Sequence, residues 1–290
     1  NSLQFQQSFY SEIWDTVNPN FTSPTRPLET LQRSRGNIAL DGNYGSQLTW
    51  TLSPRTILVG RYNITQGGYN YIGFYENLTT PQHRDQITGI RSGNFTATRE
   101  RPRRDEVSVK SDTYLPGRRV NNNLSYGVQI SRNKDYRFDI QPGNVIYLDL
   151  NGQPDQAQFV GPDVRGAVSK AQGIWGENET TLGRFTFKYG GRFDRMASTS
   201  QDVPQVDNQF SQIGTFKGSG KLVTWNTFSP RAGMAVRLTD DGKTSLRVVA
   251  GRYYLPLYLS EFSVLSPGRA MTTTMQYDPA TAGYTRLVSV

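Results

Sequence analysis

Cysteine is absent from this chain of 290 residues, and histidine occurs once, as His83. The lack of cysteine excludes disulfide bonds and thiolate metal sites. With one histidine, neither a His-based catalytic triad nor a transition-metal site has its usual set of side chains. We therefore expect a protein that is not an enzyme, with no catalytic residues, no cofactor and no bound metal.

Long hydrophobic runs are also absent. Hydrophobic residues make up 35% of the chain, and no run approaches the roughly 18 apolar residues of a transmembrane helix. A membrane barrel is not excluded, because each of its strands gives a much weaker signal. The first residues, Asn1 to Phe5, lack the basic start and apolar core of a signal peptide. We therefore expect a mature piece or a fragment of a longer protein.

Aromatic residues and glycine, by contrast, are plentiful, with 16 Tyr, 14 Phe, 4 Trp and 28 Gly. This aromatic content argues against disorder. The formal net charge is +8, from 32 Lys and Arg against 24 Asp and Glu. A basic balance suits nucleic acid, anionic lipid or an anionic solute, and composition does not choose among these partners.

The clearest pattern is an alternation of apolar and polar residues in 228–239 and again in 244–254. Side chains alternate between the two faces of a strand. The Asp241-Gly242 pair between the two runs is typical of a hairpin turn. The sequence therefore predicts two antiparallel strands with one apolar face.

The same alternation recurs along the chain and predicts about eight strands. They are expected at 38–52, 56–64, 106–115, 122–132, 167–177, 182–194, 228–239 and 244–254. A short additional strand is expected at 145–150. Residues 1–35 contain three X-Pro breaks and are expected to be irregular.

The spacing of the breaks between these strands has a rhythm. Short breaks near 54, 117, 181 and 241 alternate with long polar connections near 65–105, 133–165, 195–226 and 255–290. A soluble sandwich, the alternative, has no reason to keep all long loops at one end. Outer-membrane barrels have short periplasmic turns and long extracellular loops, and a tilted strand crosses the bilayer in about 9–11 residues.

The predicted fold class is therefore all-β, an antiparallel transmembrane β-barrel that is partial, with apolar faces toward lipid. Aromatic residues near strand ends are expected to form girdles at the membrane interfaces. These residues are Trp50, Tyr62, Tyr114, Tyr126, Trp175, Tyr253 and Tyr254.

Three stretches resemble a known family. They are TLGRFTFKYGGRFDR from Thr181 to Arg195, FSPRAG at 228–233, and DDGKTSLRVVAGRYY at 240–254. In this order they are similar to barrel strands of TonB-dependent outer-membrane receptors of the Oar-like group, whose full proteins carry a carboxypeptidase-regulatory-like N-terminal domain. One departure is Thr180, where the family usually has tryptophan.

The resemblance implies a barrel of about 22 strands around a plug domain. Neither a plug nor the short box that contacts TonB is recognised here, so residues 1–290 are expected to be an internal part of the barrel. The implied function is uptake of an unidentified solute across the outer membrane of a Gram-negative bacterium. The implied partners are outer-membrane lipid, the TonB complex through the missing plug, and the solute, with no nucleic acid.

Two other functions are weighed against transport. A passive or adhesin-like barrel would use its long loops to contact surfaces, and the presence or absence of an upstream plug would distinguish it from a transporter. A membrane-embedded enzyme is disfavoured, because no Ser/His/Asp constellation is visible.

Candidate site residues come from the faces opposite the apolar ones. The candidate lumen-lining basic residues are Arg61, Lys110, Arg184, Lys188, Arg192, Arg231, Arg237 and Arg247. They would attract an anionic solute or an acidic plug surface; alternatively, they pair with neighbouring strands and select nothing. A candidate extracellular aromatic loop contains Tyr69, Tyr71, Phe74 and Tyr75, which would capture substrate, or pack on itself, or anchor at the interface.

Overall fold

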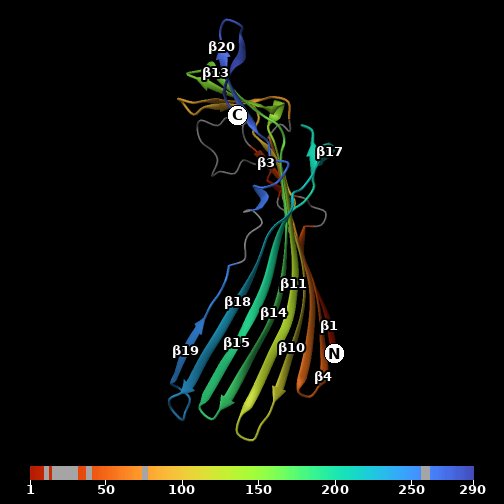
Figure 1. Ribbon diagram of the computed structural model, residues 1–290, viewed down its shortest axis with the longest axis vertical. Helices are drawn as coiled ribbons and strands as arrows, with labels where there is room; N and C mark the ends of the chain where they lie inside the picture. Colours follow the sequence, from red (N-terminus) through yellow and green to blue (C-terminus); the bar gives the residue numbers. More distant parts are fainter. Residues whose placement is uncertain (10–12, 15–31, 37–40, 74–77, 256–261) are drawn as a thin grey trace.

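The computed structural model describes the chain except for residues 10–12, 15–31, 37–40, 74–77 and 256–261. Almost all of its regular structure is β-strand, arranged in three sheets (Figure 1). No helix in the described part of the chain has the length and apolar character needed to cross a membrane. The predicted all-β fold class is confirmed.

The largest sheet contains a continuous antiparallel path of strands that follow one another in chain order. We call this path the wall. Its strands are β1 (Ser2–Phe9), β4 (Gly42–Ser53), β5 (Thr56–Gln66), β10 (Arg103–Leu115), β11 (Asn121–Ile140), β14 (Asp163–Leu182), β15 (Phe185–Ser200), β18 (Gly220–Arg237) and β19 (Ser245–Gly251). Such an up-and-down order is that of a membrane barrel.

Short turns join the strands at one end of the wall, at the bottom of Figure 1. They fall at 54–55, 116–120, 183–184 and 238–244. The break expected near 181 therefore lies slightly later, where Gly183 adopts a φ of 56°. Gly242 has a φ of 70° in the last turn, a conformation that glycine adopts without steric cost.

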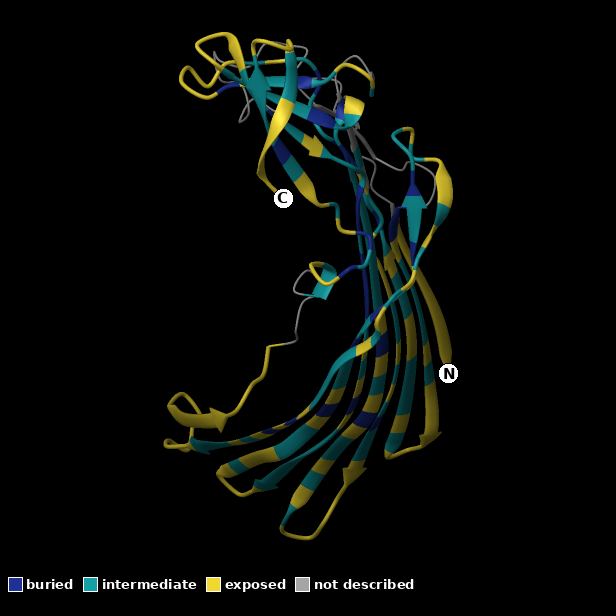
Figure 2. Ribbon diagram, turned by 45° about the horizontal axis from the view of Figure 1, so that its top comes forward, coloured by how far each residue is buried: buried dark blue, intermediate teal, exposed yellow. Residues whose placement is uncertain are grey.

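The long connections at the other end are structured. Parts of 65–105, 133–165 and 255–290 form a second sheet with the order β21-β20-β13-β12-β7-β8, which we call the cap sheet. Its strands are β7 (Gln82–Asp85), β8 (Arg91–Ser92), β12 (Val145–Leu150), β13 (Gln153–Val160), β20 (Thr272–Asp278) and β21 (Gly283–Ser289). Figure 2 shows the cap sheet leaning toward the concave side of the wall.

Smaller elements complete this end. Four short strands extend the wall sheet, and a hairpin forms the third sheet. They are β2 (Ile13–Trp14), β3 (Gln32–Gly36), β6 (Tyr69–Gly73), β9 (Ala97–Glu100), β16 (Val203–Val206) and β17 (Gln212–Phe216), with one 3-10 turn η3 (Pro142–Asn144) before β12.

Two expectations from the sequence are corrected. The prediction that residues 1–35 are irregular is wrong for Ser2–Phe9, which pairs with β4 along its whole length. The strands predicted at 122–132 and 167–177 stop where the apolar alternation stops, whereas β11 and β14 remain paired as far as Asp139 and Asp163. Backbone hydrogen bonding between strands does not require an apolar face, so hydrophobic periodicity underestimates their length.

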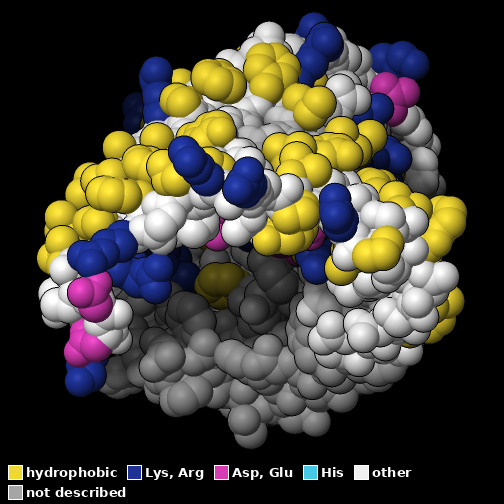
Figure 3. Space-filling model, turned by 90° about the horizontal axis from the view of Figure 1, so that it is seen from below, with side chains coloured by type: hydrophobic (Ala, Val, Ile, Leu, Met, Phe, Trp, Pro, Cys, Tyr) yellow, Lys and Arg dark blue, Asp and Glu magenta, His cyan; other side chains and the backbone are white. Residues whose placement is uncertain are grey.

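Strand pairing places the apolar side chains of the wall in continuous rows. One row runs through Val109, Val128, Ile174, Phe193 and Phe228, each opposite the next. These side chains are between 39% and 59% exposed, far more than in a soluble core. Figure 3 shows hydrophobic side chains gathered along the outer arc of the wall. An apolar surface of this extent is the lipid-facing side of a barrel.

The buried hydrophobic core lies instead toward the long-connection end of the molecule (Figure 2). Val164, Val203 and Val206 form a fully or nearly buried cluster with Tyr136 packed against it. Gly166 permits this packing, because a Cβ atom there would lie 2.6 Å from Val203 and 2.8 Å from the Tyr136 ring. The β16–β17 hairpin is thereby fixed against the extended part of β11 and β14.

The expected aromatic girdles are corrected in part. Trp50 and Tyr62 lie on the apolar face, where they pair with Leu58 and Val107. Tyr126 lies on the same face, two residues from Val128. Trp175 pairs with Arg192, and Tyr114 pairs with Asn123, on the opposite face. Aromatic character alone does not determine which face of a strand a residue occupies.

Candidate functional site: the lumen face and its mouth

Seven of the eight predicted lumen cations lie on wall strands, on the face opposite the apolar rows. The seven are Arg61, Lys110, Lys188, Arg192, Arg231, Arg237 and Arg247. Most of their cross-strand partners are polar or small, such as Gly233 opposite Lys188 and Ser229 opposite Arg192. Trp175, on the other side of Arg192, is an exception. The hydrophobic periodicity therefore identified this face from sequence alone.

Several of these cations have protein partners. Lys110 lies 2.9 Å from Asp112, and Lys188 lies 3.2 Å from Glu177. Arg61 Nε donates to the side-chain Oε1 atom of Gln47 at 2.7 Å. Exposed pairs of this kind contribute about 0–1 kcal/mol each. These contacts hold the side chains against the strand surface. They agree with the alternative that the cations pair with neighbouring strands.

Arg192 makes the most complete set of contacts on this face. Its Nε donates to both carboxylate oxygens of Asp194 at 2.8 Å, and its Nη2 donates to Gln129 at 3.0 Å. Glycine at position 173 leaves room for this pair, because a Cβ there would lie 2.5 Å from Asp194 Oδ1. The group bridges three adjacent strands, β11, β14 and β15.

Arg184 occupies a place different from the one expected. It lies in the short turn after β14, outside the wall strands, and forms an ion pair with Asp240 of the next turn. Arg237 donates to the Gly183 carbonyl at 3.1 Å. These two contacts hold neighbouring turns together at the rim, so Arg184 is not part of the lumen lining.

Arg231 and Arg247 differ from the other lumen cations. Within the described residues, neither makes a hydrogen bond or ion pair. Arg231 lies between Gly190 and Gly251 on its two neighbouring strands, so no side chain flanks it across the sheet. These two guanidinium groups are therefore available to a partner in the lumen.

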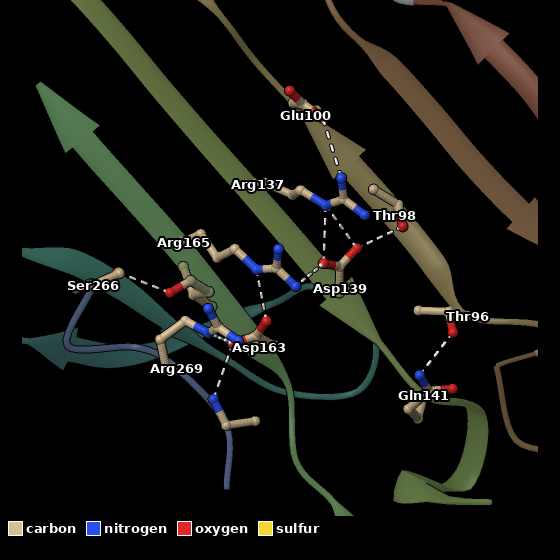
Figure 4. A network of polar contacts seen from close by, with 12 residues as sticks. Thr96, Thr98, Glu100, Arg137, Asp139, Gln141, Asp163, Arg165, Ser266 and Arg269 are labelled. Carbon is tan, nitrogen blue, oxygen red and sulfur yellow. Dashed lines mark hydrogen bonds and ion pairs between the residues drawn. The ribbon is translucent and has the colours of Figure 1, made fainter. Parts of the chain in front are cut away.

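A denser polar network lies on the same face where β11 and β14 reach the long-connection end, which we call the mouth (Figure 4). Asp139 is its centre. Its carboxylate accepts from Thr98 at 2.6 Å, from Arg137 Nε at 2.9 Å and pairs with Arg165 at 3.2 Å. Glu100 of β9 lies 3.8 Å from Arg137. Strands β9, β11 and β14 are thus joined through one carboxylate.

Asp163 connects this network to the segment beyond the last wall strand. Its carboxylate accepts from Arg165 Nε at 2.8 Å, from Arg269 Nε at 2.8 Å and from the Ala270 amide at 3.0 Å. Ser266 donates to the Val164 carbonyl at 2.9 Å and accepts from the Gly166 amide at 3.1 Å. The chain after β19 is therefore tied back to the start of β14.

The charges of the mouth network balance in alternating rows of like charge. Arg137 faces Arg165, and Asp139 faces Asp163, so like charges are directly opposite and opposite charges are diagonal. The three arginine side chains are 32–38% exposed, whereas Glu100, Asp139 and Asp163 are 11–19% exposed. The solvent-facing surface of this balanced cluster is consequently dominated by guanidinium donors.

The three arginines and two aspartates of this network line a cavity of about 490 Å³ at the mouth. Phe95, Thr98, Gln141 and Thr272 contribute to its walls, and Gln141 donates to Thr96 at 2.7 Å. On the same face of β11, the Oδ1 atom of Asp135 is buried and has no hydrogen-bond partner within the described residues. A polar cavity with arginine donors suits an anionic or hydroxyl-bearing solute.

Sequence reasoning did not identify the mouth network. The signal was present, since Arg137-Phe138-Asp139 and Asp163-Val164-Arg165 both place opposite charges on one strand face. It was overlooked because both triplets lie in segments expected to be loop. Only strand pairing shows that the two triplets face each other.

Two of the four aromatic candidates lie on a described strand at the same end of the molecule. Tyr69 and Tyr71 belong to β6, which pairs with β3 and β9. Phe74 and Tyr75 lie outside the described residues. The role predicted for these four aromatic residues remains a prediction.

The described part of the chain contains no group of His, Cys, Asp and Glu side chains able to hold a metal ion. His83 lies in the cap sheet, where Nδ1 is 3.0 Å from Asp149 and the ring is 4.7 Å from that of Tyr147. These contacts are consistent with a structural role for His83 in the cap sheet.

The chain is similar to a solved structure and matches a family model. Among solved structures, the ferric citrate transporter FecA in its unliganded form is similar, with 11% identity and a TM-score of 0.43, over 72% of this chain and 26% of that one. The chain thus spans about a quarter of the length of that protein. No curated protein matches. The family model of the TonB-dependent receptor-like β-barrel matches residues 2–284, and the chain belongs to this family.

Proposed function

We propose that this chain forms part of the barrel of an outer-membrane transporter that takes up a solute with energy delivered through TonB. The observation that carries the proposal is the two-faced wall within a chain that matches the receptor-barrel family over 2–284. The outer face contacts lipid, and the polar face lines the path of the solute. The TonB complex acts through a plug domain supplied by the rest of the receptor.

We further propose that the solute meets the mouth network before it reaches the lumen wall. The arginines of the mouth present exposed donors around a cavity, and Arg231 and Arg247 lie unpaired on the same face of the wall. An anionic solute would first contact the arginines of the mouth, and Arg231 and Arg247 would then bind the solute or an acidic surface of the plug. Membership of the Oar-like group rests on the three sequence stretches at 181–195, 228–233 and 240–254.

The test uses the full-length receptor in its own cells. Cells with and without the receptor gene, each with functional or disrupted TonB, are grown in a mixture of solutes, and depletion of each solute from the medium is followed by mass spectrometry. We expect at least one solute to be depleted only when both the receptor and TonB are present. Receptor-dependent depletion that persists without TonB would contradict energy coupling and support a passive barrel.

Two variants test the path within the barrel. Arg231→Gln removes an unpaired lumen cation, and Lys243→Gln makes the same charge change in a turn, where Lys243 pairs with Asp241. We expect Arg231→Gln to slow TonB-dependent depletion and Lys243→Gln to leave it unchanged. Equal rates in the two variants would exclude Arg231 from the solute path and from the plug contact.

A further inference from the structure

The outer face of the wall changes its chemistry at the upper edge of the apolar rows. Val107 and Ile130 are paired partners, and they are 48% and 54% exposed. The next pair on this face toward the mouth is Asp105 with Arg132, and Arg132 faces Lys170 on the other side. The apolar lipid-facing side chains are therefore replaced by charged side chains in the next row.

Six cations occupy this face in three consecutive rows that begin at the level of Ile130, and we call them the basic belt. They are Arg103, Arg132, Lys134, Lys170, Arg195 and Lys221. Five of the six side chains are exposed, and Lys134 is partly covered, with its Nζ 4.5 Å from the centre of the Tyr136 ring. The belt crosses β10, β11, β14, β15 and β18.

The belt has few anionic partners in the protein. Its single carboxylate, Asp105, is engaged by Arg103, with Nη2 at 2.7 Å and Nε at 3.0 Å. Within the described residues, the remaining exposed members make no hydrogen bond or ion pair; they are Arg132, Lys170, Arg195 and Lys221.

Arg132 and Lys170 are directly opposite each other, an arrangement that is destabilising for like charges unless an anion lies between them. The lumen face of the same strands differs, because Arg192 is neutralised by Asp194 there. Asp105 on the neighbouring strand offsets part of the charge of Arg132. Lys170, Arg195 and Lys221 have no carboxylate opposite them on the neighbouring strands.

We propose that the basic belt binds the phosphate groups of an anionic membrane lipid whose acyl chains lie along the apolar rows beneath it. Basic side chains immediately beside a lipid-facing surface lie at headgroup level, and guanidinium groups bind phosphate oxygens in pairs. Five strands spaced about 4.8 Å apart give a belt about 19 Å wide, enough for a lipid that carries two phosphates. The belt is on the face opposite the mouth network, so this site is distinct from the solute path.

The test measures lipid binding to the purified, delipidated full-length receptor. The probes are bisphosphorylated lipid A, the same lipid after enzymatic removal of its phosphates, and inorganic phosphate as a competitor. The test variant is Arg132→Gln/Lys170→Gln. The matched control, Lys110→Gln/Lys188→Gln, removes the same charge from the lumen face.

We expect the test variant to bind lipid A about 25-fold more weakly, since each cation near a headgroup contributes about fivefold. The control is expected to bind like the unaltered receptor, and the dephosphorylated lipid is expected to bind the test variant and the unaltered receptor equally. Unchanged lipid A affinity in the test variant would overturn the proposal. Displacement of lipid A by an equal concentration of inorganic phosphate would also overturn it, by showing a site for free anion.

Folding is checked by the heat-dependent shift in gel mobility that folded barrels show. Lys170→Gln alone replaces the double variant if the latter does not fold, with an expected loss of about fivefold. Since Lys170 is exposed and has no ion pair to lose within the described residues, a folding defect in this single variant is not expected. Unchanged lipid A affinity in the folded single variant would likewise overturn the proposal.

Discussion

Replacement of Asp139 by asparagine tests whether ion pairs hold the strands of the mouth together. The substitution keeps the shape of the side chain but removes the negative charge that Arg137 and Arg165 share. Those two arginines are paired directly across β11 and β14. Without the carboxylate they become like charges in contact range, which is unfavourable.

The magnitude follows from the contacts that are lost. Asp139 is 11% exposed, and it forms ion pairs with two arginines at 2.9 and 3.2 Å. A hydrogen bond to a charged group contributes about 1.5–3 kcal/mol. The arginines are 37% and 32% exposed, so solvent screening reduces each contact to about 1 kcal/mol. The expected loss is about 2 kcal/mol, confined to the strands that meet at the mouth.

The assay is hydrogen–deuterium exchange of the full-length receptor. Strand β9 (Ala97–Glu100) pairs with β11 next to Asp139, so its amides report local opening. A loss of about 2 kcal/mol lowers their protection about thirtyfold. Asp278→Asn, at the β20–β21 turn, is the control and is expected to leave β9 unchanged.

Two results would refute the reasoning. Unchanged protection of β9 in Asp139→Asn would show that the charge network does not stabilise the mouth. A uniform loss of protection over all wall strands would show that the effect is global rather than local. The double variant Asp139→Asn/Arg165→Gln removes the unpaired charge as well, and it is expected to recover part of the protection through non-additivity.

Three further predictions concern other parts of the molecule. Hydrogen bonds from the Thr88 and Gly152 amides lower the pKa of Asp85 to about 2. Because this pKa is lower than in the unfolded chain, the ionised carboxylate stabilises the fold, and amide protection from hydrogen exchange around the β7–β8 turn should fall as the pH drops from about 4 to about 2. Asp85→Asn should abolish this pH dependence. Val128→Arg, on the lipid face, should destabilise the barrel by about 2 kcal/mol in folding titrations, whereas Asn123→Arg, on the lumen face opposite Glu179, should be tolerated. Single cysteines at Asp240 and Gln209 should react with membrane-impermeant reagents from opposite sides, periplasmic and external respectively, and labelling of both from one side would contradict the barrel topology.

The wall could be predicted because each strand carries its own pattern. In 228–239, apolar and polar residues alternate strictly, and Met234 and Val248 are indeed paired on one face. Strand β1 was missed because the X-Pro breaks that follow it made residues 1–35 look irregular, whereas its pairing with the distant β4 fixes it as a strand. The upper half of β11 was missed because Arg132 and Lys134 interrupt the apolar alternation of its outward face, which resumes at Tyr136 and Phe138 while the backbone ladder continues without a break.

Sequence alone determined the fold class, the alternation of the two faces and the place of cations such as Arg192 and Arg231 on the face opposite the apolar rows, because side-chain direction in a strand depends only on local geometry. Tertiary structure decided everything that depends on pairing between distant segments. The Arg137–Asp139 and Asp163–Arg165 triplets become one network only when β11 and β14 are aligned, and Arg269 joins them from far along the chain. The cap sheet likewise gathers strands from three separate connections. Register between strands is a long-range property, and no single segment of the sequence carries it.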